Sequence, residues 1–138
     1  MVANPTQPMD NCFLPENDRE YLETKGLQYT EVKEPKQNGL IIENYTLPAG
    51  KYNVSTTRLL IIIPQGYNDA HPDMFYCYPT LTLMPGNNPP AATTGAITFN
   101  GITWQQWSRH LNTGNDWRAG IDGIGSYLQK VNHALRTA

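Results

Sequence analysis

The sequence predicts a single α+β domain in which helices pack against one antiparallel sheet. Two observations support this class. Residues 29–83 hold β-rich segments separated by Pro and Gly turns, and the end of the chain has apolar residues at spacings of three and four. A chain of 138 residues can bury a core without disulfides or metals. We expect residues 1–12 to be a flexible lead-in and residues 13–138 to form the domain.

The first expected element is a helix that begins near Pro15. Proline suits the first helical turn, where its missing N–H would have no partner, and the acidic residues after it favour the positive end of the helix dipole. Tyr21 and Leu22 give the helix an apolar side, and Gly26 supplies the left-handed residue that commonly ends a helix.

Four strands, connected as an antiparallel meander, are expected next. They span residues 29–32, 39–47, 55–63 and 74–83. The third strand contains the aliphatic run 59–63. A strand with one exposed face would alternate polar and apolar residues, so we expect this strand to be central and covered on both faces. In the fourth strand, Phe75 and Cys77 should face one side and Tyr76 and Tyr78 the other.

The next segment, residues 84–103, is rich in Pro, Gly, Asn and Thr and is expected to be a long irregular connection with a short strand at residues 97–99. Long ordered loops in compact domains are often functional. The chain then returns to a helix whose apolar residues form a single stripe. The stripe consists of Ile121, Ile124, Leu128, Val131 and Leu135.

Composition argues against several classes of function. A net charge of −2 and a pI near 5.8 provide no basic field for a nucleic acid. The longest aliphatic run is far too short to cross a bilayer, and the N-terminus is polar, so we expect a cytoplasmic protein without membrane association. We expect reduced cysteines, no cofactor and no metal, because the His and Cys residues lack zinc-ligand spacing.

Three local motifs, in this order, are similar to those of ubiquitin-conjugating enzymes. LIIIPQGY at 60–67, followed by AHPDMF at 70–75, resembles the apolar strand, the "PxGYP" turn and the proline-led entry to the fourth strand. DWRAGI at 116–121 resembles the "W-S-P-A-L" start of the helix after the active site. WQQWSRH at 104–110 resembles the bacterial branch called prokaryotic conjugating-enzyme family E. The similarity spans about residues 13–135.

The resemblance implies a UBC-like fold with an N-terminal helix, a four-stranded antiparallel meander, a long active-site loop and a C-terminal helix. It implies a protein that carries or transfers a ubiquitin-like modifier. The implied partners are a ubiquitin-like protein, an activating enzyme and a JAB-type peptidase. Counting back from Trp117 by the spacing of the family, the nucleophilic cysteine would fall at Arg109, so the usual cysteine is absent. The triplet at 71–73, His-Pro-Asp, precedes the fourth strand, and we interpret its proline as the strand-entry residue.

Ser108 is the candidate acyl carrier that replaces the missing cysteine. A hydroxyl is a weak nucleophile without a base, and the ordinary pKa of histidine, near 6.5, suits His110 to that task. Residues two apart share one face of an extended strand, whereas a helix would separate them by about 200°. The hypothesis therefore requires an extended or turn backbone here. Arg109, Asn100 or Asn112 would then steady the developing oxyanion.

A purely structural interpretation of the same segment stays open. In it, Trp104, Trp107 and Trp117 cap the core. Arg109 and His110 then pair with acids such as Asp116 or Asp122. Cys77 is the competing nucleophile, although a cysteine among aromatic strand residues usually packs as a small apolar side chain.

The function has two alternatives on the same fold and one on another. The chain is either an acyl transferase of the ubiquitin-conjugating type, for which the hypothesis is a serine oxyester, or a catalytically inactive UBC-like subunit that binds a ubiquitin-like protein or its activating enzyme. Formation of a covalent adduct separates these two. A more remote alternative is an unrelated α+β binding module.

Overall fold

The computed structural model describes residues 12–109 and 117–138. Within these residues the chain forms two helices and six strands. In chain order they are α1 (Glu16–Thr24), β1 (Gln28–Lys33), β2 (Asn38–Thr46), β3 (Thr56–Ile63), β4 (Phe75–Tyr78), β5 (Ala96–Phe99), β6 (Ile102–Trp107) and α2 (Ile124–Thr137). The predicted α+β class is confirmed, but the strand count exceeds the predicted four.

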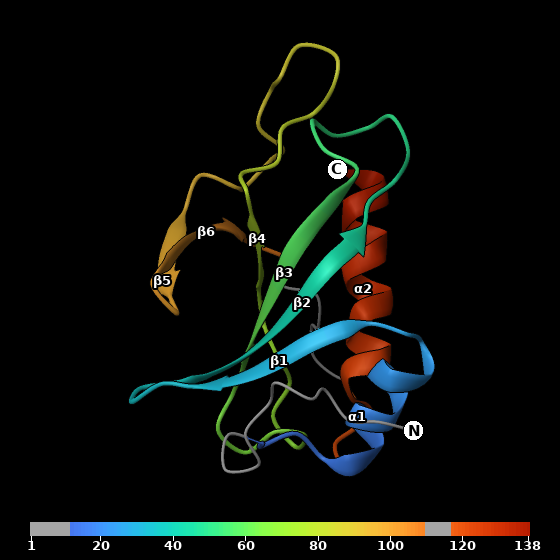
Figure 1. Cartoon of the computed structure of the whole chain (residues 1–138), viewed down its shortest axis with the longest axis vertical. Helices are drawn as coiled ribbons and strands as arrows, with labels where there is room; N and C mark the ends of the chain where they lie inside the picture. Colours follow the sequence, from blue (N-terminus) through green and yellow to red (C-terminus); the bar gives the residue numbers. More distant parts are fainter. Residues whose placement is uncertain (1–11, 110–116) are drawn as a thin grey trace.

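The six described strands form one antiparallel sheet in the order β1-β2-β3-β4-β6-β5. Both helices lie on the right of the sheet in Figure 1, whereas β5 and β6 curve away to the left. The first four strands make the predicted meander. β6 returns beside β4, with Trp107 opposite Phe75.

Two strand predictions need correction. The fourth strand ends at Tyr78 rather than Leu83, because Pro79 follows and has no N–H for the ladder. The short strand expected at 97–99 is confirmed as β5. The irregular connection, however, does not extend to residue 103, since β6 begins at Ile102. β6 was not predicted because its sequence lacks the alternation of polar and apolar residues that marks a strand with one exposed face. Trp104 and Trp107 are buried on its two opposite faces.

The prediction that β3 is covered on both faces is confirmed. Leu59 and Ile61 belong to the core on the helix side of the sheet. Leu60 belongs to a second core on the opposite side, together with Phe99 and Trp104 of the β5–β6 hairpin. The hairpin packs so closely on the sheet that a Cβ atom at Gly39 would lie 2.5 Å from the Phe99 ring. Glycine is therefore required at this point of β2.

α2 begins at Ile124 and buries the predicted stripe except for Ile121. Ile121 lies before the helix and is 68% exposed, so its inclusion in the stripe is wrong. The other four stripe residues are all buried in the core on the helix side.

The first turn of α2 is joined to α1 by the buried carboxylate of Asp18. Asp18 Oδ1 accepts a hydrogen bond from the Ile124 backbone N–H (3.1 Å), and Oδ2 accepts one from the Tyr67 hydroxyl (2.6 Å). An acid at this position compensates the unpaired N–H groups and the positive end of the helix. Gly123 allows the close approach, since a Cβ there would lie 2.4 Å from Oδ1. Burial, and then the hydrogen bond to Asp18, raise the pKa of Tyr67 above its usual range.

We predict that Asp18→Ala lowers the free energy of unfolding by about 2–4 kcal/mol, because it removes a helix cap and leaves the Tyr67 hydroxyl unpaired. Tyr67→Phe should cost less, about 1–2 kcal/mol, because the helix cap survives. Urea unfolding followed by circular dichroism measures both values. Glu16→Ala, an exposed acid in the same helical turn, is the control. Equal losses for Glu16→Ala and Asp18→Ala would contradict the role of Asp18.

Candidate functional site

Two of the three tryptophans in the segment 104–117 are core residues. Trp104 and Trp107 are both fully buried, but on opposite faces of β6. Trp107 stacks on Phe75 with ring centroids 5.3 Å apart. The structural interpretation therefore holds for these two side chains.

Gln105 lies between the two tryptophans and is itself buried. Its Oε1 accepts hydrogen bonds from the Leu81 backbone N–H and from Trp107 Nε1, both at 3.0 Å, and its Nε2 donates to the Leu81 carbonyl at 3.1 Å. One amide side chain thus replaces the ladder that β4 loses at Pro79. It also satisfies the indole N–H, which would otherwise be costly to bury.

Ser108 lies where the chain leaves the sheet. The side chain is half-buried, and its Oγ accepts a hydrogen bond from Gln106 Nε2 at 3.0 Å. Its backbone N–H donates to the Ala92 carbonyl (3.0 Å), and the Arg109 N–H donates to the Trp107 carbonyl (2.8 Å). The latter bond spans two residues and defines a turn centred on Ser108. The backbone at 108–109 is therefore a turn and not a helix, as the serine hypothesis requires.

Arg109 lies beside Ser108 and contacts two groups. Its guanidinium carbon is 4.9 Å from the centroid of the Trp107 ring, and Nη1 donates to the Ala91 carbonyl at 2.8 Å. The expected pairing with Asp122 is wrong, because the Asp122 carboxylate binds Arg118 Nη2 at 2.9 Å. Hydrogen bonds from the Arg118 side chain and backbone lower the pKa of Asp122 to about 2.

His110 and Asn112 of the serine hypothesis, and Asp116 of the structural interpretation, lie outside the described residues. Asn100 is in the turn before β6, where its backbone N–H donates to Glu34 Oε2 at 2.7 Å. The six residues of β6 separate it from Ser108. A strand of that length spans about 20 Å, so Asn100 cannot steady an oxyanion at Ser108.

Cys77 points into the core on the helix side of the sheet, as its predicted side of the strand requires. It has no exposed surface, and burial raises the pKa of its thiol to about 12. A reactive cysteine needs an accessible thiolate. These properties favour packing over nucleophilic attack.

Trp117 closes the other end of the segment against the turn after β3. Its Nε1 donates to the Asn68 carbonyl at 2.8 Å, and its ring lies 6.4 Å from the Tyr67 ring and 6.1 Å from the His71 ring. The sequence does not predict this contact, because the partners are 49 residues apart. The resemblance to the "PxGYP" turn was the available signal.

The His71-Pro72-Asp73 triplet lies directly before β4, as interpreted from the sequence. His71 Nδ1 is 2.9 Å from the Pro72 carbonyl, and the Asp73 carbonyl accepts a hydrogen bond from the Tyr127 hydroxyl at 3.0 Å. The Tyr127 bond joins the entry of β4 to α2.

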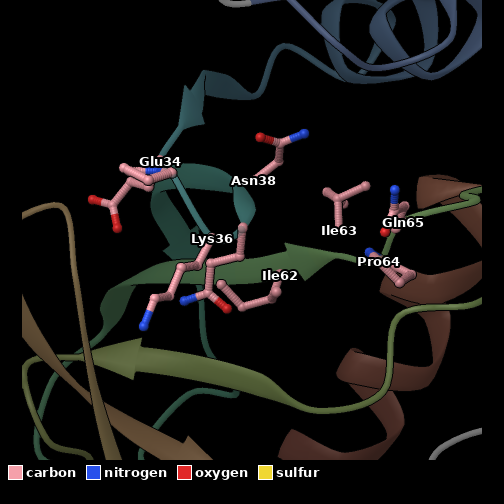
Figure 2. Close-up of a pocket in the computed structure, with 9 residues that line it drawn as sticks. Glu34, Lys36, Asn38, Ile62, Ile63, Pro64 and Gln65 are labelled. Carbon is pink, nitrogen blue, oxygen red and sulfur yellow. The ribbon is translucent and has the colours of Figure 1, made fainter.

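A hollow of about 500 Å³ lies between the β1–β2 turn and the end of β3. Its lining includes Glu34, Lys36, Asn38 and Gln65, and Figure 2 shows these side chains spread around the hollow rather than converging on one point. Of the candidate catalytic residues that the structure describes, Ser108, Arg109 and Cys77, none lines it. In the described part of the chain, no group of three or more His, Cys, Asp or Glu residues is placed to hold a metal ion.

The antiparallel sheet with its helices on one side, and the tryptophan-led return to α2, are consistent with the ubiquitin-conjugating (E2) class of fold. A family model described as prokaryotic E2 family E matches residues 14–138, and the chain belongs to this family. The resemblance expected from the motifs is thereby confirmed. Comparisons with curated proteins and with solved structures found no match. No helix among the described residues is long and apolar enough to cross a membrane.

We predict that Gln105→Leu lowers the free energy of unfolding by about 2–4 kcal/mol, because the Leu81 backbone groups and the Trp107 N–H lose their partner in a buried place. Chemical denaturation, followed through tryptophan fluorescence, measures the change. Thr103→Val, an exposed substitution on the same strand, should change stability by less than about 0.5 kcal/mol. A loss for Gln105→Leu no larger than for Thr103→Val would show that the amide bonds are unimportant.

We predict that Cys77 resists iodoacetamide in the folded protein at pH 8. With a thiol pKa of about 12, the thiolate is about one part in ten thousand at that pH, and the sulfur is also covered. Peptide mass spectrometry measures the extent of Cys77 alkylation in buffer and in about 8 M urea, which unfolds the protein. Modification of Cys77 in buffer at the rate of an unfolded thiol would contradict its burial.

Proposed function

We propose that the chain is an E2-like protein that receives a ubiquitin-like modifier from an activating enzyme and carries it as an oxyester on Ser108. The position of Ser108 is the observation that supports this most. It is half-buried, lies in a turn at the exit of β6, and its Oγ accepts rather than donates in the bond from Gln106. The hydroxyl proton is therefore left for a base. Cys77, by contrast, is fully buried.

Ser108 Oγ attacks the thioester carbonyl of the modifier on the activating enzyme, and the C–S bond breaks as the C–O bond forms. The hydroxyl proton passes to a base, for which we propose His110, and then to the leaving thiolate. Arg109, next in the chain, would stabilise the negative charge on the carbonyl oxygen. An amine of the acceptor later displaces Ser108.

The second candidate is a subunit that binds the modifier or its activating enzyme without chemistry. The hydrogen bond from Gln106 to Ser108 favours this candidate. Among the described residues it is the side chain bonded to Ser108 Oγ, and a neutral amide cannot act as the base that takes the hydroxyl proton. Under either proposal we infer a cytoplasmic protein that works with a ubiquitin-like protein and an activating enzyme. A JAB-type peptidase is a further proposed partner, which would remove the modifier.

The test is incubation with a ubiquitin-like protein, its activating enzyme and ATP, followed by intact-mass and peptide mass spectrometry. We predict an adduct on Ser108 that survives dithiothreitol but is cleaved by mild base. Ser108→Ala should abolish it, and Ser108→Cys should convert it into a thioester that dithiothreitol removes. Cys77→Val serves as the control for the competing nucleophile.

Two outcomes would overturn the carrier proposal. Persistence of the adduct in Ser108→Ala would assign the acyl group to another side chain. Binding of the charged activating enzyme without any adduct would leave the noncatalytic subunit as the function.

A further inference from the structure

The segment 74–108 contains no charged residue and no histidine, although the chain has ten Lys and Arg and twelve Asp and Glu residues. It comprises β4, β5, β6 and the connection between them. Two of its large apolar side chains, Tyr78 and Met84, are each 43% exposed. Depletion of charge is typical of the centre of a protein interface. The surface made by this segment is therefore suited to contact with a protein partner.

β5 forms the end of the sheet beside β6, and within the described residues no strand pairs with its outer edge. The Gln106 N–H bonds to the Gly95 carbonyl at 2.9 Å, which marks a hydrogen-bonded pair. Such pairs alternate along an antiparallel ladder, so Ile97 bonds to β6 while Ala96 and Thr98 direct their N–H and C=O groups outward. Proteins usually protect such edges with charges or proline. β5 has neither.

The direction of β5 determines where an added strand would end. β5 runs from the Ser108 side of the sheet toward the turn at Asn100 and Gly101, and the chain before it passes Ser108, whose N–H bonds to the Ala92 carbonyl. An antiparallel partner runs the opposite way and finishes near Ala92 with its C-terminus. Antiparallel pairing is also slightly more stable than parallel pairing.

The chain just before β5, where that C-terminus would arrive, contacts a cation. A hollow of about 200 Å³ lies farther along the same chain, lined in part by Thr80, Thr93, Gly95 and Ala96, and neither Ser108 nor Arg109 lines it. Arg109 is the first charged residue after the neutral segment, and its bond to the Ala91 carbonyl holds it beside the same chain. A guanidinium at this point attracts a carboxylate.

A second copy of the chain fits this edge poorly. β5 has four residues, of which two face outward, and a symmetric pairing of two such strands falls short of the roughly 1,000 Å² that a stable interface buries. A flexible tail needs only the edge itself. Main-chain hydrogen bonds give such added strands their affinity.

We propose that the outer edge of β5 binds the extended C-terminal tail of a ubiquitin-like protein as an added antiparallel strand and delivers its carboxyl end to Ser108 and Arg109. The identity of the partner rests on the proposed function. The binding mode rests on the outer edge of β5, which none of the described strands pairs, on the direction of β5 and on the lack of charged side chains in residues 74–108.

The first test uses ubiquitin and a peptide of its last eight residues, free and C-terminally amidated, with the full chain labelled for NMR. At a peptide concentration about ten times the Kd, hydrogen exchange of the Ala96 and Thr98 amides should slow about tenfold. The Ile97 amide, already bonded to β6, should change little. The amidated peptide should bind more weakly, since it lacks the charge that Arg109 attracts. Absence of protection at Ala96 and Thr98 at millimolar peptide would overturn the inference.

The second test is Thr98→Pro, which removes an outward N–H without breaking a bond to β6. We predict at least about a tenfold slower transfer to Ser108 at low modifier concentration with little change in Tm. Lys33→Pro removes an exposed N–H from β1, the opposite edge of the sheet, and is the control. If Thr98→Pro does not fold, the exchange experiment on the unmutated chain decides.

The two proposals fail in different ways. An adduct on Ser108 that forms equally fast in Thr98→Pro would refute binding at the β5 edge and leave the carrier function intact. Protection of Ala96 and Thr98 without any adduct would refute the carrier function and support the edge as the binding site.

Discussion

The coverage of β3 is the constraint on which the rest of the structure depends. Five consecutive aliphatic residues, 59–63, leave this strand no face that can meet water at low cost. α2 covers one face, and the β5–β6 hairpin has to fold across the other. Because the hairpin covers this face, Trp104 points inward, β5 is the outermost of the described strands on that side, and Ser108 lies where β6 ends.

Much of this fold could be predicted because the signals are local. The aliphatic run requires a central strand, and the stripe from Ile124 to Leu135 requires an amphipathic helix. β6 could not be recognised in this way. Gln105 reads as a surface residue, yet it is buried because Leu81, which is distant in sequence, supplies the partners of its amide. Only the folded chain brings these groups together.

The site could be predicted only in part, because only some of its signals are local in the sequence. The choice of Ser108 rests on the order of motifs, and the turn at this residue agrees with that choice. The sequence does not show which acid pairs with which arginine, because several acids lie nearby in the chain and only the folded structure determines which one is within reach. Asp122 pairs with Arg118, four residues earlier in the chain, while Arg109 stacks on Trp107. The position of Arg109 in the chain did not indicate that its guanidinium would contact the Trp107 ring and the Ala91 carbonyl instead of an acid.

The Asp18 junction has a consequence for the two halves of the chain. One carboxylate joins residues separated by 106 positions, so the first helix and the last are fastened to each other directly as well as to the sheet. The start of α2 cannot open without removing a partner of Asp18, and loss of α1 leaves the Ile124 N–H unpaired. The first turns of the two helices should therefore open together, and a fragment lacking α1 would lose order first at the start of α2.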